Sequence, residues 1–261
     1  MPKALTQSVF LLIFLSLHLQ GEAPSVPTFS YDVVRILPHD PGAFTQGLLL
    51  HNGFLYEGTG QKGASTIRKI QVDTGRVLKS RALADNYFGE GITVLDEKIY
   101  QLTWKSKKGF VYNLKTFEKE SEFDYDSEGW GLTQDGQSLI MSDGTQTIRF
   151  LDPNTFKERR SLSVSYQGRP TRYLNELEYA HNHIYANIWT TDYLAKIDPK
   201  SGHIVALIDV RGLLPNESRA QTDVFNGIAY NLDSDTFYVT GKWWPKVFEI
   251  KLVPPKPKPD S

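Results

Sequence analysis

The sequence contains no cysteine, which excludes disulfide bonds, thiolate catalysis and cysteine-ligated zinc. It also lacks an excess of charge of either sign, because 29 lysine and arginine residues nearly balance 30 aspartate and glutamate residues. A net charge of -1 provides no electrostatic attraction to nucleic acid or to an anionic membrane surface. Aromatic residues, in contrast, are abundant: the 261 residues include 14 Phe, 13 Tyr and 5 Trp, more than an ordinary core requires.

A membrane-spanning run is missing as well. The apolar run at residues 9–19 has 11 residues, whereas a bilayer span needs about 20. Lys3 precedes this run and small residues follow it, so we expect residues 1–25 to be a secretory signal peptide, with an uncleaved anchor or tether as the alternative. We therefore expect a secreted or periplasmic protein that has no membrane span after signal removal.

The body of the chain repeats a pattern of short strands. Five related motifs each begin a unit: Gln46-Gly47-Leu48, Glu90-Gly91-Ile92, Trp130-Gly131-Leu132, Asn175-Glu176-Leu177 and Asn226-Gly227-Ile228. A second and a third apolar run follow each motif. A fourth strand is predicted in the first four units, at 77–83, 119–125, 159–164 and 203–210. The fifth unit has none, and an unassigned strand lies at residues 31–37.

Four short strands in each repeat of about 40–45 residues are the signature of a β-propeller blade. We predict an all-β fold with nearly no helix, a five-bladed β-propeller over residues 26–253, with a β-sandwich as the alternative. Residues 31–37 would complete the last blade and close the ring. We expect an irregular or helical insert at 211–223 and an extended Pro/Lys-rich tail at 254–261.

The repeat predicts which residues line the central axis, because the first strand of each blade faces the channel. The residues before the glycine position form one row: Gln46, Glu90, Trp130, Asn175 and Asn226. The ends of the second strands form another: Gly60, Trp104, Gly144, Trp189 and Lys242. Aromatic walls with a few polar groups are typical of a pocket for a small ligand, although a purely structural channel is the alternative.

Nine short strings carry a resemblance to a known family. They are AFTQGL (43–48), YEGTG (56–60), YFGEGIT (87–93), YQLTW (100–104), GWGLT (129–133), YLNELEY (173–179), NIWTTD (187–192), DVFNGIAY (223–230) and VTGKWW (239–244). Together they resemble glutaminyl-peptide cyclotransferases of the plant and bacterial type, over about residues 30–252. The resemblance also implies a five-bladed propeller. It implies that Glu90 is the essential acidic residue and that the following residues form the pocket wall: Phe44, Gln46, Trp104, Trp130, Asn175, Trp189 and Lys242.

The reaction implied by this resemblance is intramolecular. The α-amine of an N-terminal glutamine attacks its own side-chain amide, releases ammonia and leaves pyroglutamate. We expect Glu90 to carry the proton, because tryptophan walls would raise its pKa by desolvation. Gln46, Asn175 or Lys242 would stabilise the developing oxyanion. We expect no cofactor and no metal, partners that are peptides or proteins with an N-terminal glutamine, no nucleic acid, and a monomer.

Two other functions fit the same pattern. In a calcium-dependent, lactonase-like hydrolase, the oxygen atoms of Gln46, Glu90, Asn175 and Asn226 would surround a Ca²⁺ ion on the axis. A single carboxylate with three amides is a weak site of this kind. A non-catalytic propeller that binds peptides would need the tryptophans but not Glu90.

Overall fold

The computed structural model describes residues 25–256 and consists almost entirely of β-strands. The prediction of a signal peptide concerns residues that lie, except for Ser25, outside this described part, and the last five residues of the predicted tail lie outside it too. Within residues 25–256, no helix has the length and hydropathy needed to cross a membrane.

The strands follow one another in antiparallel groups along the chain. The first sheet contains β2 (Thr45–His51), β3 (Phe54–Thr59), β4 (Thr66–Gln71) and β5 (Val77–Ala82). The second contains β6 (Gly89–Leu95), β7 (Lys98–Thr103), β8 (Lys108–Asn113) and β9 (Lys119–Asp124). The third contains β10 (Leu132–Gln134), β11 (Leu139–Ser142), β12 (Thr147–Leu151) and β13 (Glu158–Ser163).

An eight-stranded sheet comprises the remaining long strands. In spatial order they are β16 (Leu174–Ala180), β17 (His183–Ile188), β18 (Tyr193–Ile197), β19 (Ile204–Asp209), β1 (Thr28–Pro38), β22 (Lys246–Val253), β21 (Thr236–Gly241) and β20 (Phe225–Asn231). The predicted insert at 211–223 is confirmed, because it contains the short helix α1 (Asn216–Arg219). The small hairpin of β14 (Ser165–Tyr166) and β15 (Arg169–Pro170) was not predicted.

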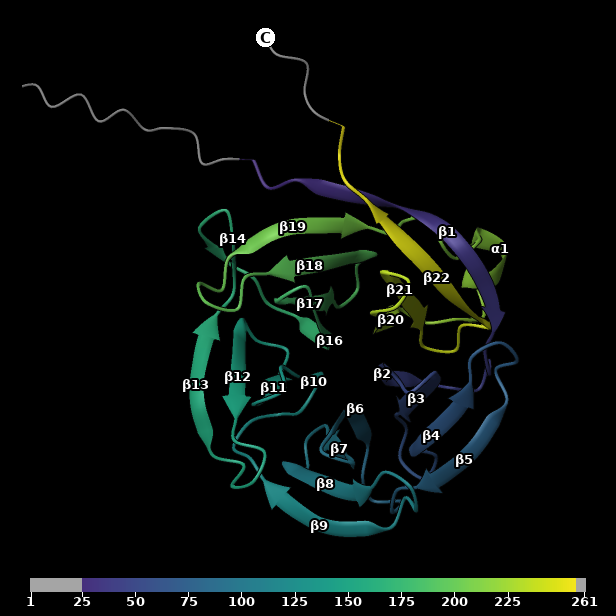
Figure 1. Cartoon of the computed structure of the whole chain (residues 1–261), viewed down its shortest axis with the longest axis vertical. Helices are drawn as coiled ribbons and strands as arrows, with labels where there is room; N and C mark the ends of the chain where they lie inside the picture. Colours follow the sequence, from purple (N-terminus) through teal and green to yellow (C-terminus); the bar gives the residue numbers. More distant parts are fainter. Residues whose placement is uncertain (1–24, 257–261) are drawn as a thin grey trace, which may run out of the picture.

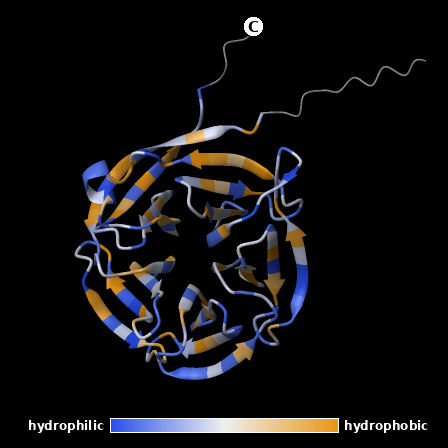
Figure 2. Cartoon of the chain, turned by 180° about the vertical axis from the view of Figure 1, so that it is seen from behind, coloured by the Kyte–Doolittle hydropathy of each residue, from blue (hydrophilic) through white to orange (hydrophobic). Residues whose placement is uncertain are grey.

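The sheets are arranged in a ring with the first strand of each group innermost (Figure 1). Inner strands such as β2 and β6 are almost fully buried, whereas outer strands such as β5 and β13 are largely exposed. Hydrophobic and hydrophilic residues alternate along many of the strands (Figure 2), as expected where one face packs against a neighbouring sheet. The prediction of an all-β fold is confirmed.

The N-terminal strand β1 joins two parts of the ring. It pairs antiparallel with β22, from Ser30 opposite Val253 to Pro38 opposite Lys246, so the predicted pairing of residues 31–37 with the last unit is confirmed. Thr28 and Phe29 also pair in parallel with β19. This second pairing was not predicted, and it merges two of the predicted units into one continuous sheet.

The innermost strands approach one another closely because glycine lies at their contact points. A Cβ atom at Gly47 would lie 2.5 Å from the backbone nitrogen of Ile92, and one at Gly91 would lie 2.5 Å from that of Leu132. The Gly91 nitrogen also donates a hydrogen bond of 2.7 Å to the carbonyl oxygen of Trp130. Any larger side chain at these two positions would push neighbouring inner strands apart.

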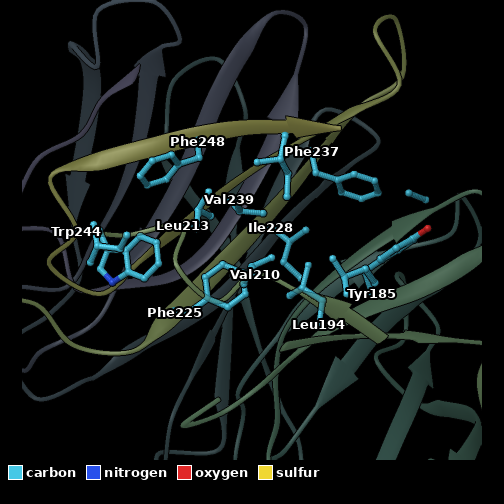
Figure 3. Packing of buried hydrophobic residues seen from close by; sticks show 14 residues of the cluster. Tyr185, Leu194, Val210, Leu213, Phe225, Ile228, Phe237, Val239, Trp244 and Phe248 are labelled. Carbon is cyan, nitrogen blue, oxygen red and sulfur yellow. The ribbon is translucent and has the colours of Figure 1, made fainter. Parts of the chain in front are cut away.

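Apolar side chains fill the spaces between neighbouring sheets. Figure 3 shows one such cluster, in which Ile228 and Phe237 of β20 and β21 pack towards Tyr185 and Leu194 of β17 and β18. Trp244, which is 1% exposed, lies in the same cluster just after β21. The core therefore holds the inner strands and the loops between them in fixed positions.

Candidate active site

Irregularities in the innermost strands lie at the predicted axial residues. The register of β2 shifts at Gln46, that of β6 at Glu90 and Gly91, that of β16 at Asn175 and Glu176, and that of β20 at Asn226 and Gly227. A β-bulge turns a side chain out of the regular alternation and is frequent beside active sites. The bulges thus explain how polar residues of buried strands can point away from the sheets.

One cavity of about 520 Å³ lies at the end of the inner strands where these bulges occur. The cavity brings together all eight residues that the sequence predicted for the site: Phe44, Gln46, Glu90, Trp104, Trp130, Asn175, Trp189 and Lys242. Asn226, Gly60 and Gly144 of the predicted rows do not line it. Six further residues, which the repeat and the resemblance do not predict, also line it: Gln61, Phe88, Lys105, Glu128, Tyr173 and Asp223.

A chain of side-chain amides holds the buried carboxyl group of Glu90. Asn226 Nδ2 donates to Gln46 Oε1 at 3.3 Å, and Gln46 Nε2 donates to Glu90 Oε1 at 3.1 Å. Asn226 Nδ2 also donates to the carbonyl oxygen of Thr45 at 3.0 Å, which anchors the chain to the backbone of β2. Asn226 therefore does not line the cavity itself but holds Gln46, which in turn binds Glu90.

Glu90 and Lys242 form the electrostatic centre of the cavity. Burial raises the pKa of Glu90 well above its ordinary value; the charge of Lys242 opposes this shift and that of Glu128 adds to it. Burial lowers the pKa of Lys242, while Glu90 and Asp223 oppose that change. Both groups are thus less strongly biased towards their charged forms than they would be in water, which suits the transfer of a proton near neutral pH.

Aromatic rings form two arcs around the cavity. Phe88 meets Phe44 and Trp104 edge to face, with ring centroids 6.0 and 5.6 Å apart respectively. Trp189 meets Trp130 in the same way at 5.8 Å. Such walls exclude water from a small ligand and present flat apolar surfaces to it.

Asn175 lines the cavity and, among the described residues, has an unused hydrogen-bond acceptor beside it. Its Oδ1 atom is buried and, within the part of the chain that the structure describes, has no hydrogen-bond partner. A buried polar atom without a partner is costly, so a small rotation of this side chain that exposed the oxygen to the cavity would allow it to accept a hydrogen bond from a ligand. The next residue, Glu176, accepts hydrogen bonds from the backbone nitrogens of Leu48 at 3.2 Å and Ile228 at 2.8 Å. Glu176 thus links β16 to β2 and β20 beside the cavity.

Several lining residues that sequence analysis missed share one position in the repeat. Phe88, Glu128 and Tyr173 each lie two residues before a residue of the first axial row, as Phe44 does. Alternate residues of an extended chain face the same side, so this spacing was the signal that could have identified them. Of the residues at this position, only Phe44 is expected in the pocket, because the family resemblance implies it.

The side-chain orientations do not favour a ring of calcium ligands. The Nε2 amide group of Gln46 faces Glu90, and the amide nitrogen of Asn226 faces Gln46, so amide hydrogens occupy positions where a cation would need oxygen lone pairs. Among residues 25–256, no group of three or more His, Asp or Glu side chains has a geometry that could hold a metal ion.

Comparisons with known proteins agree with one another. A family profile described as glutamine cyclotransferase matches residues 7–252. A glutaminyl-peptide cyclotransferase of Arabidopsis thaliana is 41% identical over 263 aligned positions, which cover 96% of this chain and 82% of the relative. The crystal structure of Myxococcus xanthus glutaminyl cyclase superposes with a TM-score of 0.82 at 33% identity, and the match covers 88% of this chain and 99% of that one.

Proposed function

The chain belongs to the glutamine cyclotransferase family and has the transferase activity of that family; from this premise we propose that its cavity cyclises the N-terminal glutamine of peptides and proteins to pyroglutamate, with Glu90 as the proton carrier. The observation that carries the proposal is the buried carboxyl group of Glu90 in an aromatic-walled cavity of about 520 Å³. That volume is within the range of pockets for small ligands.

The reaction needs little covalent chemistry from the protein. The α-amine and the side-chain amide belong to the same glutamine, and their reaction closes a five-membered ring, so much of the entropic cost of bringing them together is already met by the substrate. The α-amine has an ordinary pKa of about 7.7–8.0, so part of it is neutral and nucleophilic at neutral pH. The aromatic arcs would select the rotamer of the substrate glutamine in which its amine lies close to its side-chain amide, and they would exclude water.

Glu90 would move the proton that the reaction must relocate. When the amine nitrogen bonds to the side-chain carbonyl carbon, it gains a positive charge and must lose a proton. The departing amide nitrogen must gain one before its bond to that carbon breaks and ammonia leaves. A carboxyl group with a raised pKa, such as that of Glu90, can accept the first proton and donate the second, so it ends the cycle unchanged.

Asn175 and Lys242 would position the reacting amide. The Oδ1 atom of Asn175 has no partner among residues 25–256, and a small rotation of the side chain would let it accept a hydrogen bond from the substrate's amine or amide nitrogen. Lys242, which is 6% exposed and lies 4.8 Å from the centroid of the Phe44 ring, would stabilise the negative charge on the carbonyl oxygen during attack. Gln46 is less available for this role, because its amide already binds Glu90 and Asn226.

We interpret the ring of sheets as a five-bladed β-propeller that forms a single catalytic domain over residues 26–253. The blades would be β2–β5, β6–β9, β10–β13, β16–β19 and the group of β20, β21, β22 and β1. Their consecutive order along the chain and the contacts among their first strands support this interpretation. The proposal also retains a secretory signal peptide at residues 1–25 and a secreted or periplasmic location.

The proposed activity is tested by incubating the protein with a glutamine-initiated peptide and measuring ammonia. We expect release of ammonia at the same rate with and without a chelator such as EDTA, because the sequence has no thiolate and no group of three or more His, Asp or Glu side chains among residues 25–256 could hold a metal ion. Loss of turnover with chelator that Ca²⁺ or Zn²⁺ restores would contradict metal independence. A protein that binds the peptide but releases no ammonia would support the non-catalytic alternative.

Replacing Trp189 with alanine tests the role of the aromatic wall. Trp189 is 37% exposed and makes ring contacts with Trp130 and Tyr173. Its loss should therefore weaken the contact between the aromatic wall and the substrate without leaving a cavity in the core. We expect KM to rise about tenfold, which corresponds to roughly 1.4 kcal/mol of lost substrate contact, with a nearly unchanged thermal midpoint. Trp104→Ala and Trp130→Ala should likewise raise KM or lower the rate.

Trp244→Ala provides the matched comparison for the tryptophan variants. Trp244 is 1% exposed, lies in the core cluster and does not line the cavity, so its loss should cost about 3–5 kcal/mol of stability. A Trp189→Ala protein that lost stability in proportion to its activity, as a core variant does, would show that Trp189 packs sheets together and does not bind substrate.

A further inference from the structure

One carboxylate at the mouth of the cavity binds two of its tryptophans. Glu128 Oε2 accepts hydrogen bonds from the indole nitrogens of Trp104 at 2.7 Å and Trp130 at 3.0 Å. Trp104 follows β7, and Glu128 and Trp130 precede β10, so the carboxylate connects two neighbouring sheets at the cavity wall. Trp104 belongs to one aromatic arc and Trp130 to the other.

Glu128 differs from the residues at the same position in the other repeats. The equivalent residues are Phe44, Phe88, Tyr173 and Val224, all of which contribute aromatic or aliphatic surface. A charged residue at this position of the repeat is therefore an exception that requires an explanation. The two indole N–H groups provide one, because a tryptophan nitrogen near an apolar wall requires an acceptor, and an ionised acceptor makes the stronger bond.

A lysine lies beside both the carboxylate of Glu128 and the ring of Trp104. Lys105 Nζ lies 4.0 Å from Glu128 Oε1 and also lies 4.1 Å from the centroid of the Trp104 ring. The side chain of Glu128 is 39% exposed, so the group can be changed without opening the core. The charge of Glu128 also contributes to the raised pKa of Glu90.

We propose that Glu128 is a positioning residue that fixes the orientation of Trp104 and Trp130 and so sets the shape of the cavity for the glutamine side chain. This inference rests on the proposed function for its kinetic consequences but not for its structural ones. Without the shared acceptor, the two indole rings would lose their common anchor and rotate independently. Small misplacements of groups that orient a substrate can cost up to about 100-fold in rate.

Two variants of Glu128 separate hydrogen bonding from charge. Glu128→Ala removes the acceptor and should lower kcat/KM by about 10- to 100-fold, mainly through KM. Glu128→Gln removes the charge, but its one oxygen can still accept both indole hydrogens, because Oε2 alone accepts both in the native protein. We expect Glu128→Gln to retain kcat/KM to within about threefold at its own optimal pH.

The pH dependence provides a second readout, because two charged groups act on the pKa of Glu90. They are Glu128 and Lys242, which follows β21; the neutral phenol of Tyr125, after β9, also feels the charge of Glu90. Glu128 raises the pKa of Glu90, so Glu128→Gln should move the Glu90 limb of the kcat/KM profile to lower pH. A residue that only stabilises the fold would leave this limb in place.

Near-UV circular dichroism of the tryptophans reports on the contact without substrate. We expect Glu128→Ala to change the tryptophan bands, and both Glu128→Gln and the control Asp126→Ala to leave them nearly unchanged. Asp126 is an exposed carboxylate on the same loop and does not line the cavity. Failure of the wild type to release ammonia would refute the proposed function alone, since the dichroism does not depend on turnover.

Two results would overturn the positioning role. One is a Glu128→Ala protein with unchanged KM and unchanged tryptophan bands. The other is a Glu128→Gln protein as impaired as Glu128→Ala at every pH, because the charge and not the shared acceptor would then matter.

Discussion

Replacing Glu90 with glutamine should reduce turnover of a glutamine-initiated peptide by about 10²–10⁴-fold, the usual contribution of a general acid–base group. Glutamine keeps the size of the side chain and can still contact Gln46, but it cannot carry a proton. Peptide binding should therefore stay close to normal, and the loss should lie in kcat. The measurement is steady-state kinetics by ammonia release, with binding followed by quenching of tryptophan fluorescence.

Stability distinguishes this catalytic role from a structural one. Burial raises the pKa of Glu90 well above its ordinary value, so the ionised carboxylate opposes folding at pH values above that ordinary value. Glu90→Gln should accordingly be at least as stable as the wild type at neutral pH. A folded variant that retained more than about a tenth of wild-type turnover would contradict the proton-carrier role, and Lys242 would then be the next candidate.

Glu178→Gln is the matched control for Glu90→Gln. Glu178, in β16, is a half-buried carboxyl group, and burial raises its pKa to about 8. It binds the backbone nitrogen of Tyr230 and the hydroxyl of Thr133, and it does not line the cavity. This variant should keep wild-type turnover, so an equal loss in both variants would indicate a general effect of removing a buried acid.

A large loss of stability is also expected from Glu57→Gln. Glu57 is fully buried, and its Oε1 atom accepts hydrogen bonds from His39 Nε2 at 2.9 Å and Thr45 Oγ1 at 2.7 Å. His39 Nδ1 contacts the carbonyl oxygen of Trp244 at 2.6 Å, so the group connects β1, β2 and β3 to the loop that carries Lys242. Removing one partner of a buried ion pair costs about 3–5 kcal/mol, which chemical denaturation at pH 6 would measure.

The stabilising effect of this pair should depend on pH in both directions. Burial would lower the pKa of His39, but Glu57 outweighs it and raises that pKa above 6.5, so the contribution is complete below pH 6.5 and is lost as the pH rises through the folded value. Burial would raise the pKa of Glu57, but His39 and Arg68 lower it below 4.5, so that contribution is complete above pH 4.5 and is lost in acid. Both contributions are complete between pH 4.5 and 6.5.

Asp40→Asn is the control for Glu57→Gln. Asp40 pairs with Arg68 at 2.8 Å, but its side chain is 46% exposed, and exposed pairs contribute about 0–1 kcal/mol. Equal losses in the two variants, or a loss below about 1 kcal/mol for Glu57→Gln, would show that the buried pair does not hold these strands together.

The repeat in the sequence predicted most strand positions because strand alternation and turn residues are local properties. The sequence predicts fourth strands at 77–83 and 119–125, and β5 and β9 occupy 77–82 and 119–124. The parallel pairing of Thr28 and Phe29 with β19 could not be predicted, because it depends on where two distant segments meet after the ring closes.

The sequence predicted many of the residues that lie around the cavity, but not the hydrogen bonds and ion pairs that the side chains make. Gln46, Glu90 and Asn175 were identified because equivalent positions in a repeat meet at one axis. The bond from Trp104 and Trp130 to Glu128 was not identified, because it joins three different positions of the repeat across two sheets. The ion pair of His39 and Glu57 was also missed, since a histidine after the first strand carries no local sign of a buried partner.

The central claim, that the cavity closes a glutamine on itself, is tested most directly by the fate of a labelled peptide. The N-terminal glutamine would carry heavy nitrogen in its side-chain amide, and mass spectrometry would follow both the peptide and the ammonia. The account predicts labelled ammonia, a product lighter by one ammonia, and an α-amine that no longer reacts with amine reagents. Labelled ammonia with a product that keeps a free α-amine would show hydrolysis of the amide instead, and would contradict cyclisation.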